Sequence, residues 1–326
     1  MIGQPQALGL AYSRAARTEL TKLGSLAATE LTLDNWMDHP EITRQADLIL
    51  STWGMPRMDE KFLAAFPKLK ANFYAAGTVK GFVTDASYAR PVVVSSAATA
   101  NAIPVAEYTI STVLMSLKRF WSMARDVRQT KTWKRMEEGV PGTYHSTVGI
   151  VSLGAVGRSV VQMLSRFELD LIAYDPFVPK DVAEELGVEL VSLEELFRRS
   201  DVVTLHSPWI PETENLVNER LLRLMKTGAT FINTSRGAIV NEPDLCRVLK
   251  ERDDLTAILD VTHPEPPVEG SPLYQLENII LTPHIAGSMG SEVTRMGDWM
   301  VEEMRRYLNK APLRYQITQA MLARMA

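Results

Sequence analysis

The chain has 326 residues, a formal net charge of −4 and 46% apolar residues. These values are typical of a soluble globular protein with two domains, and the charge does not favour nucleic acid or an anionic membrane surface as a partner. The single cysteine, Cys246, excludes an internal disulfide and a cysteine-based metal cluster. No signal peptide or membrane-spanning segment is predicted, so the sequence favours a cytoplasmic protein.

The first hundred residues alternate strand-like and helix-like segments. Apolar runs predict strands at residues 7–11, 47–51, 70–74 and 92–95, and a helical pattern occupies residues 59–66. This alternation predicts an α/β domain with a parallel sheet.

A long helical pattern follows at residues 104–128. Pro104 suits a first helical turn. The pattern carries apolar residues on more than one side, namely Val113, Leu114, Leu117, Phe120, Trp121 and Met123. A helix of this kind is predicted to be buried on several sides. It can be an ordinary core helix, run between two domains or face a second subunit.

The strand–helix alternation resumes at residue 147 with a more regular spacing. Strands are predicted at residues 148–152, 171–174, 202–206, 230–233, 256–259 and 279–281, and the last long helix at residues 291–308. Six strands separated mostly by helices fit a doubly wound dinucleotide-binding domain.

The first of these strands leads into a glycine-bearing turn with the pattern Ser-x-Gly-x-x-Gly. Gly154 would let the backbone approach a pyrophosphate, and Gly157 would let the following helix pack closely on the strand. The helix N-terminus, with Ala155 and Val156, would present free N–H groups to the phosphates. Ser152 replaces the first glycine of the usual fingerprint, and a serine suits that turn if its φ is negative.

Asp175 ends the next predicted strand. A carboxylate there would bind both ribose hydroxyls and repel a 2′-phosphate, and no basic residue follows before Lys180. The sequence therefore favours NAD over NADP. The alternative is a plain βα turn with a solvated aspartate.

Three residues past later strand ends form a chemically sensible set: Arg236, Glu265 and His284. An arginine can clamp a substrate carboxylate, and a histidine oriented by a carboxylate can exchange a proton near neutral pH. Ligands of open α/β sheets bind at the carboxyl ends of strands, where these residues are predicted. Taken singly, Arg236 would be a surface arginine and Glu265 a loop acid. The neighbouring His263 is expected to be structural or exposed.

The motifs at residues 149–157, 205–213, 233–237, 259–266 and 281–288 occur in the order typical of one family. The chain resembles the D-isomer-specific 2-hydroxyacid dehydrogenases, over residues 70–308. The resemblance implies two doubly wound parallel-sheet domains. A Rossmann nucleotide domain, residues 102–287, would be inserted in a flavodoxin-like substrate domain formed by residues 1–101 and 288–326.

The resemblance also implies roles for individual residues. Arg236 would bind the carboxylate of a 2-keto acid. His284 would be the general acid/base, with Glu265 orienting it and favouring its protonated form. Asp260 would meet the nicotinamide carboxamide. Further cofactor contacts would come from His206, Ser207, Thr213, Thr234 and Gly287, and from Arg236 and His284 themselves.

In the first domain, Ala76 and Gly77 match the loop whose backbone N–H groups face the substrate carboxylate. The family pattern Gly-x-Gly-x-Asp is altered at residues 77–81, so the far side of the pocket is not assigned. Trp209 would contribute to the cofactor site or the pocket wall, or only pack.

The activity implied is reversible NAD(H)-dependent reduction of a small 2-keto acid to the (R)-2-hydroxy acid, in a cleft closed by domain movement. The resemblance further implies a homodimer formed through the nucleotide domains. No metal is expected, and because the chain ends at Ala326, a C-terminal regulatory domain is not expected either. Two alternatives stay open. One is an NAD-sensing co-regulator on the same scaffold, and the other is a formate or phosphite oxidiser within the family.

Overall fold

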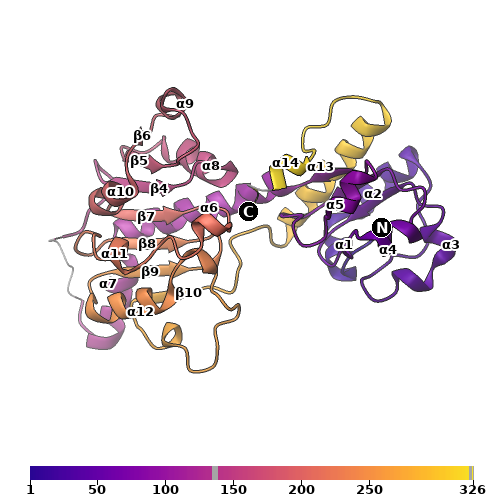
Figure 1. Ribbon diagram of the computed structural model, residues 1–326. Helices are drawn as coiled ribbons and strands as arrows, with labels where there is room; N and C mark the ends of the chain where they lie inside the picture. The colour runs from indigo at the N-terminus through magenta and orange to yellow at the C-terminus, as the bar shows by residue number, and fades with distance from the viewer. Residues whose placement is uncertain (134–138, 323–324, 326) are drawn as a thin grey trace. The chain divides into compact units, whose positions relative to one another are not determined.

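The computed structural model describes residues 1–133, 139–322 and 325. The chain divides into two compact units (Figure 1), one of Met1–Asn101 with Ser288–Met325 (unit 1) and one of Ala102–Gly287 (unit 2). Each has a parallel sheet with helices around it, so the predicted α/β class is confirmed. Within the described part of the chain, no helix is both long and apolar enough to cross a membrane.

Unit 2 is built on a seven-stranded sheet with the order β10-β9-β8-β7-β4-β5-β6, in which every neighbouring pair is parallel. The order reverses between β4 and β7, which is the switch point of a doubly wound sheet. All six predicted strands are present. The seventh, β6, has two residues, too few to give a sequence pattern. The strands are β4 (Thr147–Val151), β5 (Asp170–Tyr174), β6 (Glu189–Leu190), β7 (Val202–Leu205), β8 (Thr230–Asn233), β9 (Thr256–Leu259) and β10 (Ile279–Leu281).

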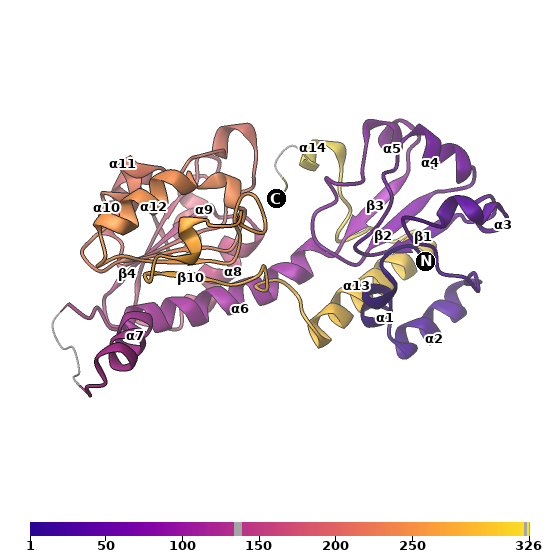
Figure 2. The same cartoon turned by 90° about the horizontal axis from the view of Figure 1, so that it is seen from below.

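Helices cover both faces of this sheet (Figure 2). One face packs against α10 (Leu193–Arg199), α11 (Glu219–Leu222) and α12 (Glu242–Glu251). The other packs against α6 (Ala98–Leu117), α8 (Ala155–Leu164) and α9 (Lys180–Glu185). Each aliphatic side chain buried in these two cores stabilises the fold by about 1.5–3 kcal/mol. Short 3₁₀ helices complete the unit: η2 (Pro211–Thr213), η3 (Gly237–Ile239) and η4 (Pro272–Tyr274).

The single helix predicted at residues 104–128 is wrong in two respects. The structure has two helices, α6 and α7 (Phe120–Thr130), separated by Arg119 with a left-handed φ of 52°. Pro104 lies inside α6 and not in its first turn. Burial on several sides does not extend to α7, where no residue is fully buried and Phe120 is 45% exposed.

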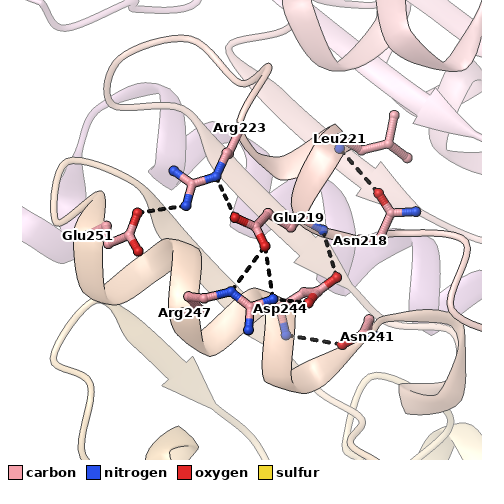
Figure 3. Close-up of polar contacts among 8 residues, drawn as sticks. All are labelled: Asn218, Glu219, Leu221, Arg223, Asn241, Asp244, Arg247 and Glu251. Atoms are coloured by element: carbon pink, nitrogen blue, oxygen red, sulfur yellow. Dashed lines mark hydrogen bonds and ion pairs between the residues drawn. The ribbon is translucent and has the colours of Figure 1, made fainter.

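Polar contacts join α11 to α12 on the surface of unit 2 (Figure 3). Glu219 accepts hydrogen bonds from Arg223 at 2.7 Å and from Arg247 at 3.0 Å, and Arg223 also reaches Glu251 at 2.6 Å. Asp244 accepts from the backbone N–H of Glu219 at 3.0 Å, across the two helices. Because these ion pairs are solvent-exposed, each adds only about 0–1 kcal/mol to the stability of the fold.

Unit 1 contains a three-stranded parallel sheet in the order β1-β2-β3, flanked by helices. Its strands are β1 (Leu48–Ser51), β2 (Ala71–Tyr74) and β3 (Val93–Ser96). Its helices are α1 (Pro5–Ala11), α2 (Arg14–Leu23), η1 (Trp36–Asp38), α3 (Pro40–Thr43), α4 (Glu60–Ala65), α5 (Asp85–Ala89), α13 (Ser291–Leu308) and α14 (Gln319–Leu322). The predicted helix at residues 291–308 is confirmed as α13.

The strand predicted at residues 7–11 is wrong, because this segment belongs to α1. Pro5 occupies its first turn, and Ala7, Leu8 and Ala11 are buried at helical spacing. A short apolar run fits either a strand or a buried helix, and periodicity alone does not separate them. The helix packs closely on α13, since a Cβ added at Gly297 would lie 1.7 Å from the Ala11 carbonyl oxygen.

A buried carboxylate on α13 anchors the segment that follows this helix. Glu303 is fully buried and accepts hydrogen bonds from the backbone N–H groups of Arg314 at 3.0 Å and Tyr315 at 3.1 Å, and from the Ser95 hydroxyl at 3.2 Å. The segment then pairs with the sheet edge through the antiparallel bridge between Ser95 and Gln316.

Replacing this carboxylate should destabilise unit 1. Glu303→Ala leaves two backbone donors without their acceptor and should lower the free energy of unfolding by about 2–3 kcal/mol. Glu303→Gln keeps one acceptor oxygen and should lose less. Urea denaturation followed by tryptophan fluorescence measures both, since Trp299 stacks on Tyr315 at 4.7 Å. Equal stability of the three proteins would contradict the anchor.

Candidate active site

The glycine turn joins β4 to α8 in unit 2. A Cβ added at Gly157 would lie 2.1 Å from the Ser152 carbonyl oxygen, so only glycine lets the helix approach the strand this closely. A Cβ added at Gly154 would meet no atom within 4 Å. Gly154 is the N-cap residue of α8 and is exposed, together with Ala155. The helix N-terminus is therefore open to a phosphate.

Ser152 differs from the expectation of a negative φ. Its φ is +78°, a left-handed conformation that costs a non-glycine residue about 1–2 kcal/mol. The carboxylate of Asp175 stabilises this turn, because it accepts hydrogen bonds from the Leu153 N–H at 2.8 Å and the Ser152 hydroxyl at 3.4 Å. Asp175 thus lies beside the glycine turn, where a dinucleotide fingerprint places its ribose-binding acid.

His206 and Thr234 lie in a buried polar cluster at the ends of β7 and β8. The ring of His206 contacts the Thr204 hydroxyl at 3.0 Å and the Thr234 hydroxyl at 3.5 Å. Burial lowers the pKa of His206 to about 3. Its imidazole is therefore neutral near pH 7 and cannot serve as a cationic group. Ser207 is buried beside it, and Thr213 donates to the Pro208 carbonyl at 2.6 Å.

His284 and Glu265 form a close pair. The Nδ1 atom of His284 lies 2.6 Å from Oε1 of Glu265, and the two side chains are 45% and 43% exposed. An ionised carboxylate only accepts, so Nδ1 carries the proton in this hydrogen bond. Nε2 is then the ring nitrogen available to exchange a proton with a ligand.

Arg236 approaches this pair from the segment after β8. Its Nη1 donates to the Ser235 carbonyl at 2.6 Å. Burial lowers the pKa of Arg236, and the nearby Glu265 carboxylate opposes that shift. The next residue explains the close packing, since a Cβ added at Gly237 would lie 2.0 Å from the backbone carbon of Thr262. The absence of a side chain at Gly237 brings the Arg236 segment against the loop that carries Glu265.

The turn that carries His284 is wrapped around the carboxylate of Asp260. This carboxylate is 2% exposed and accepts from Thr282 Oγ1 at 2.6 Å and from the N–H groups of Ile285 and Ala286 at 2.8 Å each. Asp260, which follows β9, therefore organises the turn 282–286 after β10. The hydroxyl of Tyr108 lies 2.9 Å from Thr282 Oγ1.

Tyr108 and Thr282 were not assigned a role by the sequence. Thr282 could have been noticed as a hydroxyl residue within the motif at residues 281–288, which contains His284. Tyr108 had no such signal, because it lies more than a hundred residues from the turn and only the tertiary fold brings the two together.

A cavity of about 460 Å³ borders the His284–Glu265 pair in unit 2. Its walls are largely apolar and also include Asp260, Thr262 and Thr282. Arg236 is not among the residues that line this cavity.

The remaining predicted residues have contacts of their own. His263 is exposed, as expected, and contacts the ring of Trp209, with 5.2 Å between centroids. Gly287 ends unit 2. In unit 1, the carbonyls of Ala76 and Gly77 accept from the Ser96 hydroxyl at 3.2 and 2.5 Å. Among the described residues, no group of three or more His, Cys, Asp or Glu side chains could hold a metal ion.

Comparison with known proteins identifies the family. Residues 110–286 match the model described as the D-isomer specific 2-hydroxyacid dehydrogenase NAD-binding domain. The chain is also 32% identical over 284 residues to a glyoxylate reductase of Korarchaeum cryptofilum, covering 83% of this chain and 85% of that protein. The chain belongs to the D-isomer specific 2-hydroxyacid dehydrogenase family. The glycine turn and Asp175 thus lie in an NAD-binding domain of this family.

Two further relatives show the extent of the likeness. A D-3-phosphoglycerate dehydrogenase of Mycobacterium bovis is 33% identical over 276 residues, which are 83% of this chain and 52% of that protein. The chain thus spans about half the length of the phosphoglycerate dehydrogenases it matches. The solved structure of the TT0316 protein from Thermus thermophilus has a TM-score of 0.75 and 26% identity, over 97% of this chain and 99% of that one.

The two glycines of the family's turn should respond differently to alanine. Gly157→Ala forces a Cβ into the Ser152 carbonyl and should destabilise unit 2 by about 1–3 kcal/mol, the usual effect of overpacking. Gly154→Ala meets no protein atom, so stability should be unchanged while NADH affinity falls. Thermal unfolding without cofactor and fluorescence titration with NADH separate the two effects. Wild-type NADH affinity in Gly154→Ala would show that no ligand approaches this backbone.

Proposed function

We propose that this protein is an NAD(H)-dependent oxidoreductase that interconverts a small 2-keto acid and its (R)-2-hydroxy acid. The observation that carries the proposal is the 2.6 Å contact between His284 and Glu265, with Gly237, the neighbour of Arg236, packed against the same loop. A hydrogen-bonded imidazole beside a fixed cation suits a substrate with a carboxylate next to a carbonyl. Family membership supports the same reaction class.

Each of the three residues has a separate task in this mechanism. Arg236 binds the substrate carboxylate through its guanidinium and so orients the adjacent carbonyl. Glu265 holds Nδ1 of His284 and stabilises the imidazolium form, and Nε2 then donates a proton to the carbonyl oxygen. Oxidation of the hydroxy acid returns this proton to Nε2. The glycine turn would hold NADH, which would supply the hydride for reduction. Ala76 and Gly77 of unit 1 are proposed to add backbone contacts to the substrate carboxylate.

The cofactor contacts are proposed on the same basis. Gly154, Ala155, Val156 and Gly157 would hold the pyrophosphate, and Asp175 the ribose. Asp175 is held by backbone N–H groups of Leu153 and Phe177, at 2.8 and 2.9 Å. A carboxylate fixed in this way would repel a 2′-phosphate, which favours NAD over NADP. His206, Ser207, Thr213, Thr234, Asp260 and Gly287 would complete the site.

We also propose a homodimer formed through the nucleotide-binding units. The support is α7, which leaves Phe120 exposed and has no fully buried residue in the single chain. A second copy packing on this helix would remove that apolar surface from water. Sedimentation analysis of the purified protein tests the assembly.

A panel of glyoxylate, hydroxypyruvate and pyruvate with NADH tests the proposed reaction. Consumption of NADH with any of them supports the proposal. Tight NADH binding without turnover of any keto acid would favour an NAD-sensing protein. NADH formation from formate or phosphite in place of these reactions would move the activity to another branch of the family.

Replacing the proposed acid/base should nearly abolish turnover. His284→Ala should lower kcat by ~10²–10⁴-fold, the usual contribution of a positioned acid or base. His263→Ala, in the exposed loop that follows β9, is the matched control and should keep wild-type turnover. Steady-state kinetics with the best keto acid of the panel measures both. Comparable turnover by His284→Ala and wild type would refute the assignment.

Arg236 should affect binding and turnover together. Arg236→Ala removes the carboxylate clamp, so KM for the keto acid should rise and kcat should fall. Arg236→Lys keeps the charge but loses the planar bidentate geometry, so it should restore only part of kcat/KM. Full activity of the lysine variant would show that only charge matters at this position.

A further inference from the structure

The His284 turn requires an external restraint, because His284 has a φ of +54°. A non-glycine residue in the left-handed region costs about 1–2 kcal/mol and persists where its surroundings enforce it. The enforcing group is Asp260. Its carbonyl accepts from the His284 N–H at 2.9 Å, and its carboxylate accepts from the next two N–H groups, of Ile285 and Ala286. Successive N–H groups that bind one anion beside a left-handed residue form an anion-binding nest.

A hydroxyl chain holds the carboxylate in this nest. Thr282 Oγ1 lies 2.6 Å from Asp260 Oδ1 and 2.9 Å from the Tyr108 hydroxyl. The carboxylate accepts three hydrogen bonds, and one of them uses the single proton of the Thr282 hydroxyl. The contact with Tyr108 then has one possible direction, in which Tyr108 donates to Thr282. The three groups form a directed chain from Tyr108 through Thr282 to Asp260.

We propose that Tyr108 and Thr282 are positioning residues for His284. They orient the Asp260 carboxylate, which keeps the turn 282–286 in the conformation that presents the imidazole to Glu265. Tyr108 belongs to α6, outside the loops that carry the proposed catalytic residues. The expected loss of turnover rests on the proposed function. The expected change in the conformation of the turn 282–286 rests on geometry alone.

Removing the hydroxyl chain should lower turnover without weakening the binding of the keto acid. In Thr282→Val the carboxylate loses its closest donor, and kcat should fall by about 10–100-fold, the scale of a small misplacement of a catalytic group. KM for the keto acid should not change, because Arg236 is untouched. Thr282→Ser keeps the hydroxyl and should restore kcat. Tyr108→Phe removes one neutral hydrogen bond and should lower kcat by about 2–10-fold.

A second measurement needs no activity. In the protein without ligands, the Nδ1 proton of His284, bound to Glu265, should give a low-field proton resonance, assigned by its loss in His284→Ala. It should shift or disappear in Thr282→Val and return in Thr282→Ser. Tyr88→Phe is the matched control, since it removes a tyrosine hydroxyl that donates to the Ile317 carbonyl at 3.1 Å in unit 1. It should change neither kcat nor the resonance.

The outcomes separate the two proposals. If wild type reduces no keto acid, the proposed function fails, and the resonance still decides the positioning role. Wild-type kcat together with an unchanged resonance in folded Thr282→Val would overturn the positioning role. A rise in Kd for NADH at unchanged kcat would also overturn it, because the chain would then serve the cofactor contact of Asp260.

Discussion

The parallel register of β8, β9 and β10 is the constraint on which the candidate site depends. It places Asn233 beside Leu259 and Leu259 beside Leu281, so the three strands end at the same edge of the sheet. Arg236, Glu265 and His284 follow these residues within short loops. A shift of one strand by one residue would turn its side chains to the other face of the sheet. The site is therefore fixed by backbone hydrogen bonding before any of its own side chains interact.

Two aspartates perform the same physical task in the NAD-binding domain. Asp175 accepts a backbone N–H next to Ser152, and Asp260 accepts two next to His284. Both Ser152 and His284 have positive φ values without being glycine. In each turn the left-handed residue directs neighbouring N–H groups at a carboxylate, which accepts hydrogen bonds from them. These hydrogen bonds offset the backbone strain. Residues assigned to cofactor binding thus also maintain the local backbone.

Sequence patterns predicted the repetitive parts of this fold well and the irregular parts poorly. Strand–helix alternation identified six strands of unit 2 and the helix Ser291–Leu308. Most of these strands are continuous buried apolar runs, and the helix buries one periodic apolar face. The same rule failed for α1, whose apolar run is too short to have a period. It also failed at Arg119, where a left-handed residue interrupts a pattern that stays apolar. The motifs predicted Glu265 as the partner of His284, and the two side chains are in contact in the structure. The contact between Tyr108 and Thr282 was not predicted, because no local sequence pattern encodes it.

The division of the chain has a consequence for its biosynthesis. Unit 1 takes its sheet from the first hundred residues but needs α13 and the bridge between Ser95 and Gln316 from the other end of the sequence. Unit 2 is continuous, from Ala102 to Gly287. Because domains generally fold as units while the ribosome extends the chain, unit 2 can complete its core first. Helix α1 and the strands of unit 1 must then wait, with Leu8 and Phe73 uncovered, until Met296 and Met300 of α13 emerge to cover them.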